Sequence, residues 1–338
     1  MIITADLHWG LQQDNPLWHD VSLGLANDMH DSAVKNNDNV IAVLGDLFDN
    51  NRTMTQKTQD LALEIVNGIW KDFSVILLQG NHDTYYKNRE RPNWLKMFKA
   101  TENVVVVDKE PYIRQDKCFV PWGYDISTLE WRDYLFGHFE INSFRMNNFY
   151  ECKTSTLNSK DFTCFKAVFS GHFHFPQTYN NITYLGSPFQ QNFGDVGSQR
   201  GYYLWNNGLL TFIPFEKAPK FVRIRTSEKF LPEHITGNIV KLIFDKDYGT
   251  RKNNEIVEKI EMFGPAALSS IDTSSFGVTS DISEAKTEEV VVKKNRELIE
   301  DYIKNMELPA HLKVGTLLKM VDLLAREEGP AEDMNHER

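Results

Sequence analysis

An apolar run leads directly into a glycine and two carboxylates in the segment Val40-Ile41-Ala42-Val43-Leu44-Gly45-Asp46-Leu47-Phe48-Asp49. A short, continuous apolar run that ends in turn residues is typical of a strand buried on both faces of a sheet. Functional side chains are common in the loops that follow such strands. The segment therefore predicts an α/β fold with a polar site at the end of a central strand.

Comparable runs lie on both sides of this segment. Residues 2–4 and 75–78 are short and mainly apolar and also end in polar loops, whereas apolar side chains recur with helical spacing across residues 21–35 and 56–70. Strands that alternate with helices are the pattern of an α/β sheet. Further strands are predicted at residues 104–107, 118–120, 134–136 and 167–169.

The spacing changes between residues 178 and 215, where short strands alternate with turn residues. The sequence Asn206-Asn207-Gly208 separates two apolar runs at residues 202–205 and 209–213. Asn-Gly in this position is a strong short-range signal for a β-hairpin. We therefore expect antiparallel pairing in this part of the sheet.

The pattern changes again after the predicted hairpin, and we place the end of a first domain, residues 1–215, at this point. Strands at residues 221–224 and 239–244 and a helix at 253–262 predict a small α+β accessory domain over residues 216–268.

The rest of the chain is predicted to be a linker followed by two helices. Residues 269–294 begin with a Ser- and Thr-rich stretch, which is typical of a loop or linker. Within residues 295–327, two segments on either side of Pro309 each carry apolar residues at helical spacing. Each predicted helix has one apolar face, as binding in a partner's groove requires. Packing of the two helices on each other or on their own domain is the alternative.

Composition narrows the class of protein. Hydrophobic residues make up 41% of the chain and charged residues 25%, as in an ordinary soluble globular protein. With 37 basic and 47 acidic residues, the net charge of −10 argues against non-specific nucleic-acid binding but leaves room for a local basic site. No apolar stretch is long enough to span a bilayer. Cys118, Cys152 and Cys164 form no C-x-x-C pair, so we expect a reducing, cytoplasmic location without a membrane.

Five polar motifs fall at the ends of predicted strands. They are Asp6-Leu7-His8, Gly45-Asp46-Leu47-Phe48-Asp49, Gly80-Asn81-His82-Asp83, Gly137-His138 and Gly171-His172-Phe173-His174. Taken singly, each motif is more often a capped turn than a metal site. Together they would bury many polar groups that need partners, and a metal supplies such a partner.

The residue types in these motifs favour two divalent metal ions. Carboxylate, amide and imidazole ligands together suit ions such as manganese, iron or zinc. If Asp6 and His8 lie on an extended strand end, their side chains project to the same side, and His172 and His174 have the same spacing. A carboxylate between two ions, here Asp46, can hold them about 4 Å apart, as in two-metal phosphoester hydrolysis.

In this order, the motifs resemble those of the calcineurin-like metallophosphoesterase superfamily, over residues 1 to about 190. Within it, the chain looks most like the SbcD-type DNA repair nucleases, and among these the phage members. The supporting stretches are Ala5-Asp6-Leu7-His8-Trp9-Gly10, Gly45-Asp46-Leu47-Phe48-Asp49, Gly137-His138-Phe139-Glu140, Ser170-Gly171-His172-Phe173-His174 and Tyr184-Leu185-Gly186-Ser187-Pro188. The resemblance implies a β-sandwich flanked by helices, with a DNA-capping accessory domain and a helical tail.

The resemblance also implies roles for single residues. Two divalent ions are implied, with Mn²⁺ expected and Mg²⁺ as the alternative. His82 would contact the scissile phosphate or protonate the departing oxygen. The metal ligands would be Asp6, His8 and His174 for one ion, Asn81, His138 and His172 for the other, and Asp46 as the bridge.

Asp49 is the position at which relatives differ. Cellular eukaryotic and archaeal nucleases have histidine there, whereas phosphatases and bacterial or phage SbcD-like members have aspartate, which puts a second catalytic histidine in doubt. Asp49 could accept a hydrogen bond from His82 and favour its charged form. It could equally cap the following loop through backbone amides.

Two basic stretches are candidates for contact with DNA. The first combines cations with aromatic side chains that could stack on bases, at Tyr85, Tyr86, Lys87, Arg89 and Arg91. The second comprises Lys217, Lys220, Arg223, Arg225 and Lys229. Either stretch could instead be solvated surface.

The resemblance implies the nuclease subunit of a complex that processes DNA ends in double-strand-break repair and recombination. Such subunits act as 3′-to-5′ exonucleases on duplex ends and as endonucleases on single strands. They form homodimers and bind an SbcC-type, SMC-like ATPase through C-terminal helices, here in the host cytoplasm if the chain is phage-encoded. The alternatives are a phosphatase or small-molecule phosphodiesterase of the same superfamily, and a non-catalytic DNA-binding scaffold for the ATPase.

Overall fold

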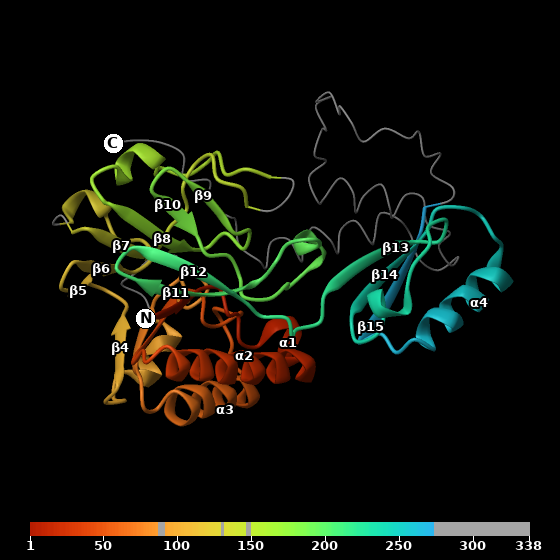
Figure 1. Cartoon of the computed structure of the whole chain (residues 1–338), viewed down its shortest axis with the longest axis horizontal. Coiled ribbons are helices and arrows are strands. Elements are labelled where there is room, and N and C mark those ends of the chain that lie inside the picture. The colour runs from red at the N-terminus through yellow and green to blue at the C-terminus, as the bar shows by residue number, and fades with distance from the viewer. Residues whose placement is uncertain (87–91, 130–131, 147–149, 274–338) are drawn as a thin grey trace, which may run out of the picture. The chain divides into compact units, whose positions relative to one another are not determined.

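The computed structural model describes residues 1–86, 92–129, 132–146 and 150–273. A six-stranded sheet forms the first layer of the described chain (Figure 1). Strands β1 to β4 are parallel, and β11 is antiparallel to both of its neighbours. In spatial order the strands are β12 (Leu209–Pro214), β11 (Gly201–Asn206), β1 (Ile2–Thr4), β2 (Val40–Leu44), β3 (Ser74–Leu78) and β4 (Val104–Val107).

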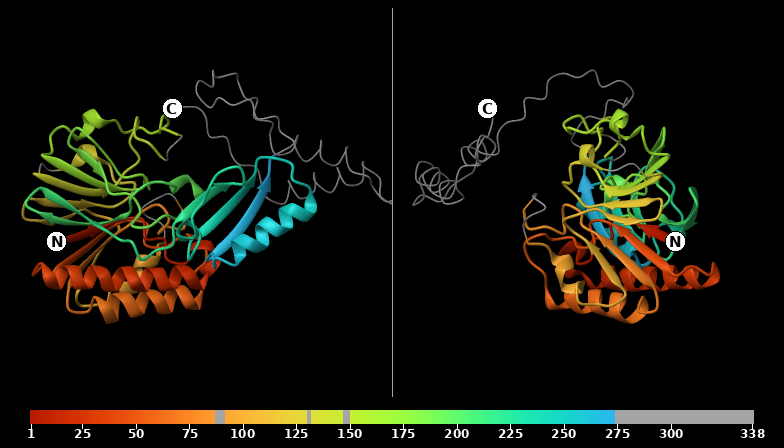
Figure 2. Two further views of the ribbon diagram at one scale, coloured as in Figure 1. Left: turned by 45° about the vertical axis from the view of Figure 1, so that its right-hand side comes forward. Right: turned by 90° about the vertical axis from the view of Figure 1, so that its left-hand side faces the viewer.

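Two helices lie side by side along one face of this sheet (Figures 1 and 2). Helix α2 (Pro16–Lys35) begins five residues before the predicted start, because Asn15 accepts a hydrogen bond from the backbone N–H of Leu17 and proline suits the first helical turn. Helix α3 (Gln56–Glu64) continues as a π-helical turn, Ile65–Ile69. The helices predicted at residues 21–35 and 56–70 are therefore confirmed.

A second six-stranded sheet packs on the other face of the first. Its inner strands β6, β7, β8 and β10 are parallel, and both edge strands pair antiparallel. Buried side chains from both sheets form one apolar cluster between them, so the fold is a β-sandwich flanked by helices, as predicted. In spatial order the strands are β5 (Tyr112–Arg114), β6 (Lys117–Val120), β7 (Tyr134–His138), β8 (Ala167–Gly171), β10 (Ile182–Tyr184) and β9 (Gln177–Tyr179).

Phe136 occupies the centre of this inter-sheet cluster and is fully buried. Its ring stacks on Phe119 at 4.8 Å and on Phe169 at 5.1 Å. We expect Phe136→Ala to lower the free energy of unfolding by about 3–5 kcal/mol, because it leaves a cavity between two sheets. Denaturant unfolding measures this change. The control is Ile113→Ala, on an edge strand where the side chain is 43% exposed and the expected change is about 0.5 kcal/mol; equal losses would contradict the prediction.

The predicted hairpin is confirmed between β11 and β12, but the antiparallel pairing expected over residues 178–215 is only partly correct, because β10 also pairs in parallel with β8. The turn residues Asn207 and Gly208 have φ angles of 47° and 88°. Positive φ at both central residues is characteristic of the tight turn that matches the twist of two antiparallel strands. The shorter helical segments elsewhere are α1 (Leu11–Asp14), η2 (Trp94–Phe98), η3 (Ile126–Thr128), η4 (Ser159–Phe162), η5 (Phe193–Asp195) and η6 (Pro232–His234).

A three-stranded parallel sheet follows the sandwich in the sequence. It consists of β13 (Phe221–Arg225), β14 (Ile239–Phe244) and β15 (Ala267–Asp272), with helix α4 (Thr250–Glu261) against one face. Strand β15 extends four residues into the region for which we predicted a linker, residues 269–294. Residues 274–294 of that region and the predicted helices at residues 295–327 lie outside the described residues. No helix in the described part is both long and apolar enough to cross a membrane.

Candidate metal centre

Strand ends of both sheets bring the predicted site residues to one place. Parallel strands end at the same edge of their sheet, so the loops after them meet. The first sheet contributes the loops after β1, β2 and β3, and the second sheet contributes the end of β7 and the loop after β8. These elements carry Asp6, His8, Asp46, Asn81, His82, His138, His172 and His174.

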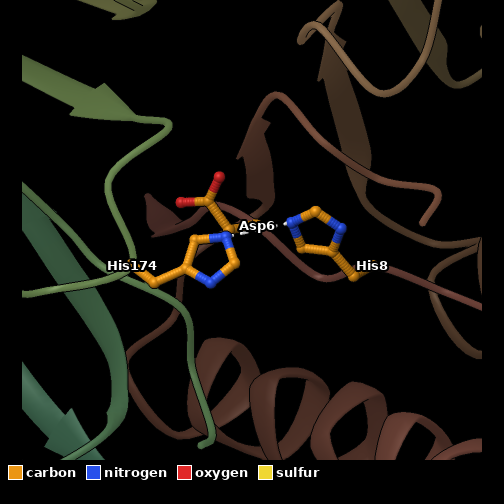
Figure 3. A group of neighbouring side chains, drawn as sticks. All are labelled: Asp6, His8 and His174. Atoms are coloured by element: carbon orange, nitrogen blue, oxygen red, sulfur yellow. Dashed lines mark hydrogen bonds between the residues drawn. The ribbon is translucent and has the colours of Figure 1, made fainter. Parts of the chain in front are cut away.

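One group of side chains consists of Asp6, His8 and His174 (Figure 3). One candidate ligand atom from each lies within 4.8 Å of the others. The Nε2 atoms of His8 and His174 face each other at 3.1 Å, although His174 arrives on a separate segment of chain. Two ring nitrogens can share only one proton at that distance, whereas a metal ion between them would use both lone pairs.

A second group consists of Asp46, His138 and His172, with Asn81 beside it. The Oδ1 atom of Asn81 lies 2.9 Å from Nδ1 of His172 and 3.1 Å from Nε2 of His138. His138 donates its Nδ1–H to the carbonyl oxygen of Leu44 at 2.8 Å, which turns Nε2 toward the group.

Asp46 belongs to the second group but also faces His8 of the first group. Its Oδ2 atom is 3.3 Å from Nε2 of His138 and 3.8 Å from Nε2 of His8. Burial would raise the pKa of the Asp46 carboxyl, but the charges of His138 and His8 outweigh burial and hold it below its usual range. Asp46 is therefore ionised, and its charge faces both groups.

Burial decides the charge of the outer histidines. It lowers the pKa of His172 to about 3, helped by the charge of His138. Burial and the charge of His8 hold the pKa of His174 well below its usual range. Both imidazoles are therefore neutral at pH 7 and offer a lone pair. The neutral imidazoles of His172 and His174, together with the carboxylates and one amide oxygen, are donors that fit divalent metal ions.

His82 sits beside these groups and is half-buried. Its Nδ1–H donates to the backbone carbonyl of Asp49 at 2.7 Å, and its backbone N–H donates to Oδ1 of Asp46 at 2.8 Å. Its ring meets that of His8 edge to face at 4.8 Å. These contacts hold His82 next to Asp46 and His8, and neither of its two hydrogen bonds uses the Nε2 atom.

The carboxylate of Asp49 takes neither of the two expected roles, which were to accept a hydrogen bond from His82 and to cap the following loop. Its Oδ1 atom lies 3.3 Å from Nδ1 of His8, and one candidate ligand atom from each of Asp49, His8 and His82 lies within 4.8 Å of the others. The Asp49 carboxylate opposes the effect of burial and raises the pKa of His8. The following loop is capped by Asn50, whose side chain accepts from the backbone N–H groups of Arg52 and Thr53. The Nδ1 atom of His82 is hydrogen-bonded to the backbone carbonyl of Asp49, whereas the carboxylate of Asp49 pairs with His8.

The sequence profile of the family described as Calcineurin-like phosphoesterase matches residues 1–224, well over half of the chain. The chain belongs to this family. The family resemblance predicted from the five motifs is therefore confirmed.

Two relatives illustrate the similarity. Exonuclease subunit 1 of Enterobacteria phage T4 is 29% identical to this phosphoesterase over 318 residues, which cover 88% of this chain and 90% of the relative. The crystal structure of Pseudomonas putida nuclease MPE matches 60% of this chain and 82% of that chain, at 16% identity and a TM-score of 0.30. A TM-score this low adds nothing to the geometry of the site.

The backbone of the phosphoesterase corrects one expectation about the D-x-H motif. Asp6 and His8 are not on an extended strand end, since β1 ends at Thr4 and their φ angles are 56° and 49°. Their N–H groups donate to the carbonyls of Gly45 and Asp46, both at 3.1 Å. Left-handed backbone in non-glycine residues costs about 1 kcal/mol or more, and such strain is concentrated at functional sites. Asp46 and His172 share this conformation, with φ angles of 53° and 92°.

Gly80 is required by its close approach to Asp46. A Cβ atom at Gly80 would lie 2.1 Å from Oδ1 and 2.3 Å from the backbone nitrogen of Asp46. We expect Gly80→Ala to weaken Mn²⁺ binding by roughly 10- to 100-fold, because it displaces the central carboxylate. A calorimetric titration with manganese measures the effect. The matched control is Gly68→Ala, where a Cβ meets no atom within 4 Å; unchanged binding in both variants would show the prediction to be wrong.

Sequence reasoning missed two side chains that shape the site. Asp83 is buried and accepts from the backbone N–H groups of Phe48 and Gly80, so it joins two of the loops. In the sequence, only its position in the third motif, Gly80-Asn81-His82-Asp83, indicated that Asp83 could belong to the site. The indole ring of Trp122 lies 5.0 Å from the ring of His172, and no motif marked it.

The candidate DNA-contacting residues are described only in part. Tyr85 and Tyr86 are 43% and 47% exposed, with ring centroids 4.5 Å apart. The cations of this stretch, Lys87, Arg89 and Arg91, lie outside the described residues. In the second basic stretch, Lys217 pairs with Asp28 at 2.7 Å, so at least this cation has a structural partner.

Proposed function

We propose that this phosphoesterase is the nuclease subunit of a DNA end-processing complex, and that it hydrolyses phosphodiester bonds with two divalent metal ions. The carrying observation is the position of Asp46, whose Oδ2 atom lies 3.3 Å and 3.8 Å from histidine nitrogens of two separate groups. Similarity to T4 exonuclease subunit 1 over 90% of that relative supports a nuclease. The word subunit in its name supports a partner protein.

The proposed ligands follow from the two groups. Mn²⁺ is the expected ion and Mg²⁺ the alternative. Ions in such a site lower the pKa of water and neutralise charge on phosphate oxygens. The first ion would be held by Asp6, His8 and His174, the second by Asn81, His138 and His172, and both by Asp46.

His82 is the proposed catalytic residue. Its Nδ1–H is held by the carbonyl of Asp49, so Nε2 is the atom available to the substrate. A protonated Nε2 can donate to a phosphate oxygen or give its proton to the departing oxygen. Asp49 acts indirectly in this proposal: its carbonyl orients His82, and its carboxylate orients His8.

DNA is the proposed substrate, with 3′-to-5′ exonuclease action on duplex ends and endonuclease action on single strands. The exposed rings of Tyr85 and Tyr86 are suited to stacking on bases. On the three-stranded sheet, Arg223 and Lys241 are register neighbours, an arrangement of like charges that a phosphate backbone would favour. An SbcC-type ATPase, a homodimer and a cytoplasmic location remain parts of the proposal, and the buried free thiols of Cys118 and Cys152 suit a reducing compartment.

An assay with three substrates tests the proposal. Purified protein is incubated with Mn²⁺ and end-labelled duplex DNA, single-stranded DNA, or a small aryl phosphodiester, with chelator-treated protein as the control. We expect both DNAs to be cut only with metal. Activity confined to the small ester would favour a phosphodiesterase. DNA binding without any cleavage, even with the ATPase present, would favour a scaffold.

A further inference from the structure

A buried ion pair lies behind the first group of side chains. Arg200 and Asp195 are 6% and 4% exposed, and Nη2 of Arg200 is 2.8 Å from Oδ1 of Asp195. Both residues precede β11, and neither is among the proposed ligands. Burying two charges is costly, so a pair in this position needs a reason beyond stability.

Arg200 holds the segment that carries His174. Its Nη1 donates to the backbone carbonyl of His174 and, at 2.8 Å, to the hydroxyl of Ser187. Its Nε donates to the hydroxyl of Ser198 at 2.8 Å. The planar guanidinium thus joins three chain segments in one fixed geometry, which a lysine could not reproduce.

Asp195 reaches the opposite side of the same group through one intermediary. Its Oδ2 accepts from the backbone N–H groups of Gln191 at 2.9 Å and Asn192 at 3.3 Å. The side chain of Gln191 then donates to the backbone carbonyl of Asp6 at 2.8 Å. The ion pair is therefore connected to both Asp6 and His174, which come from distant parts of the sequence.

The second group has a different support. His138 is oriented by the carbonyl of Leu44, and His172 by the side chain of Asn81. In the described chain, the hydrogen bonds and the ion pair of Arg200 and Asp195 involve neither His138 nor His172. A link to the second group runs only indirectly, through Asp6, whose carboxylate accepts from the backbone N–H of His172 at 3.0 Å. A change in the ion pair should therefore affect the two groups unequally.

We propose that the Arg200–Asp195 pair is a positioning clamp that sets the geometry of the first metal group through the backbones of His174 and Asp6. This inference rests on the proposed two-metal function. Metal ligands must be held within about 0.5 Å of their working geometry. Loss of outer hydrogen-bond partners typically weakens metal binding 10- to 100-fold. Both residues are positioning residues and touch neither substrate nor metal.

Manganese titrations test the clamp. In an Asn81→Ala background only the first group should bind strongly, and in a His174→Ala background only the second. We expect Arg200→Met to weaken the binding of Mn²⁺ by the first group 10- to 100-fold. The affinity of the second group for Mn²⁺ should change by no more than about 3-fold. Gln191→Leu, which removes only the link to Asp6, should give a smaller loss at the first group. Arg200→Lys should recover little of the lost Mn²⁺ affinity, because lysine keeps the positive charge but lacks the several N–H donors of the planar guanidinium.

The control variant is Lys166→Met, which removes an exposed ion pair with Asp133 of 2.6 Å and should change neither affinity. Near-ultraviolet circular dichroism checks that each variant is folded; if Arg200→Met is not, Gln191→Leu decides. Unchanged binding in a folded variant, or equal loss at both groups, would overturn the clamp. If the unaltered protein does not bind two ions, the two-metal proposal itself fails.

Discussion

Replacement of Asp46 by asparagine is expected to lower metal-dependent hydrolysis by roughly 1000-fold or more. The carboxylate faces His138 at 3.3 Å and His8 at 3.8 Å, so its negative charge acts on both groups. An amide has nearly the same shape but no charge, and its NH₂ cannot bind a metal. Metal ions held by Asp46 would neutralise charge at the phosphate, so losing this carboxylate should remove several kcal/mol of transition-state stabilisation. A 1000-fold loss of rate corresponds to about 4 kcal/mol.

The measurement is kcat at saturating Mn²⁺, together with metal content by elemental analysis. Asp133→Asn is the matched control, because that carboxylate pairs with exposed Lys166 away from the site. We expect Asp46→Asn to hold fewer than two ions and Asp133→Asn to resemble the unaltered protein. If Asp46→Asn keeps more than about a tenth of the rate with two ions bound, Asp46 does not bridge them.

The layered fold could be predicted from local sequence because strands buried on both faces are continuous apolar runs. Two strands could not. The edge strand β5 (Tyr112–Arg114) is half-exposed, and β15 (Ala267–Asp272) is mostly exposed and contains Ser269 and Ser270, which suggested a linker. Strand β5 pairs with the next strand along the chain, Tyr112 with Phe119, but its three residues include no buried side chain that would mark it as a strand. Strand β15 pairs with a distant partner, Ala267 with Ile239, and a local sequence pattern does not record such pairing.

The residue types of the site could be predicted for a related reason, since the ends of parallel strands bring their motifs together. Their backbone conformations could not, because Asp6 takes a left-handed φ through a hydrogen bond to Gly45 in another loop. The direction of the Asp49 carboxylate depends on where His8 lies. Arg200 supports His174 from 26 positions away and belongs to no motif.

Replacement of His82 by alanine is expected to lower kcat for DNA by about 100- to 10,000-fold, while two metal ions remain bound. The imidazole is lost, but the contact of His82 with Asp46 is made by the backbone N–H, which alanine retains. Measurement of kcat and of manganese content separates the two effects. His30→Ala is the control, because that histidine is half-buried, pairs with Asp31 and is not among the proposed site residues. Loss of metal along with the rate would assign His82 a structural or ligand role.

A small diester with an acidic phenol as its leaving group distinguishes the two proposed tasks of His82. An acidic phenol departs without a proton, so a general acid contributes little to that reaction. If His82 protonates the departing oxygen, His82→Ala should lose far less activity on this ester than on DNA. If His82 contacts the phosphate, it stabilises charge that develops with either substrate, and the two losses should be similar. The Nδ1–H to Asp49 contact, which leaves Nε2 for the substrate, is compatible with both tasks, so the ratio of the two losses assigns the role.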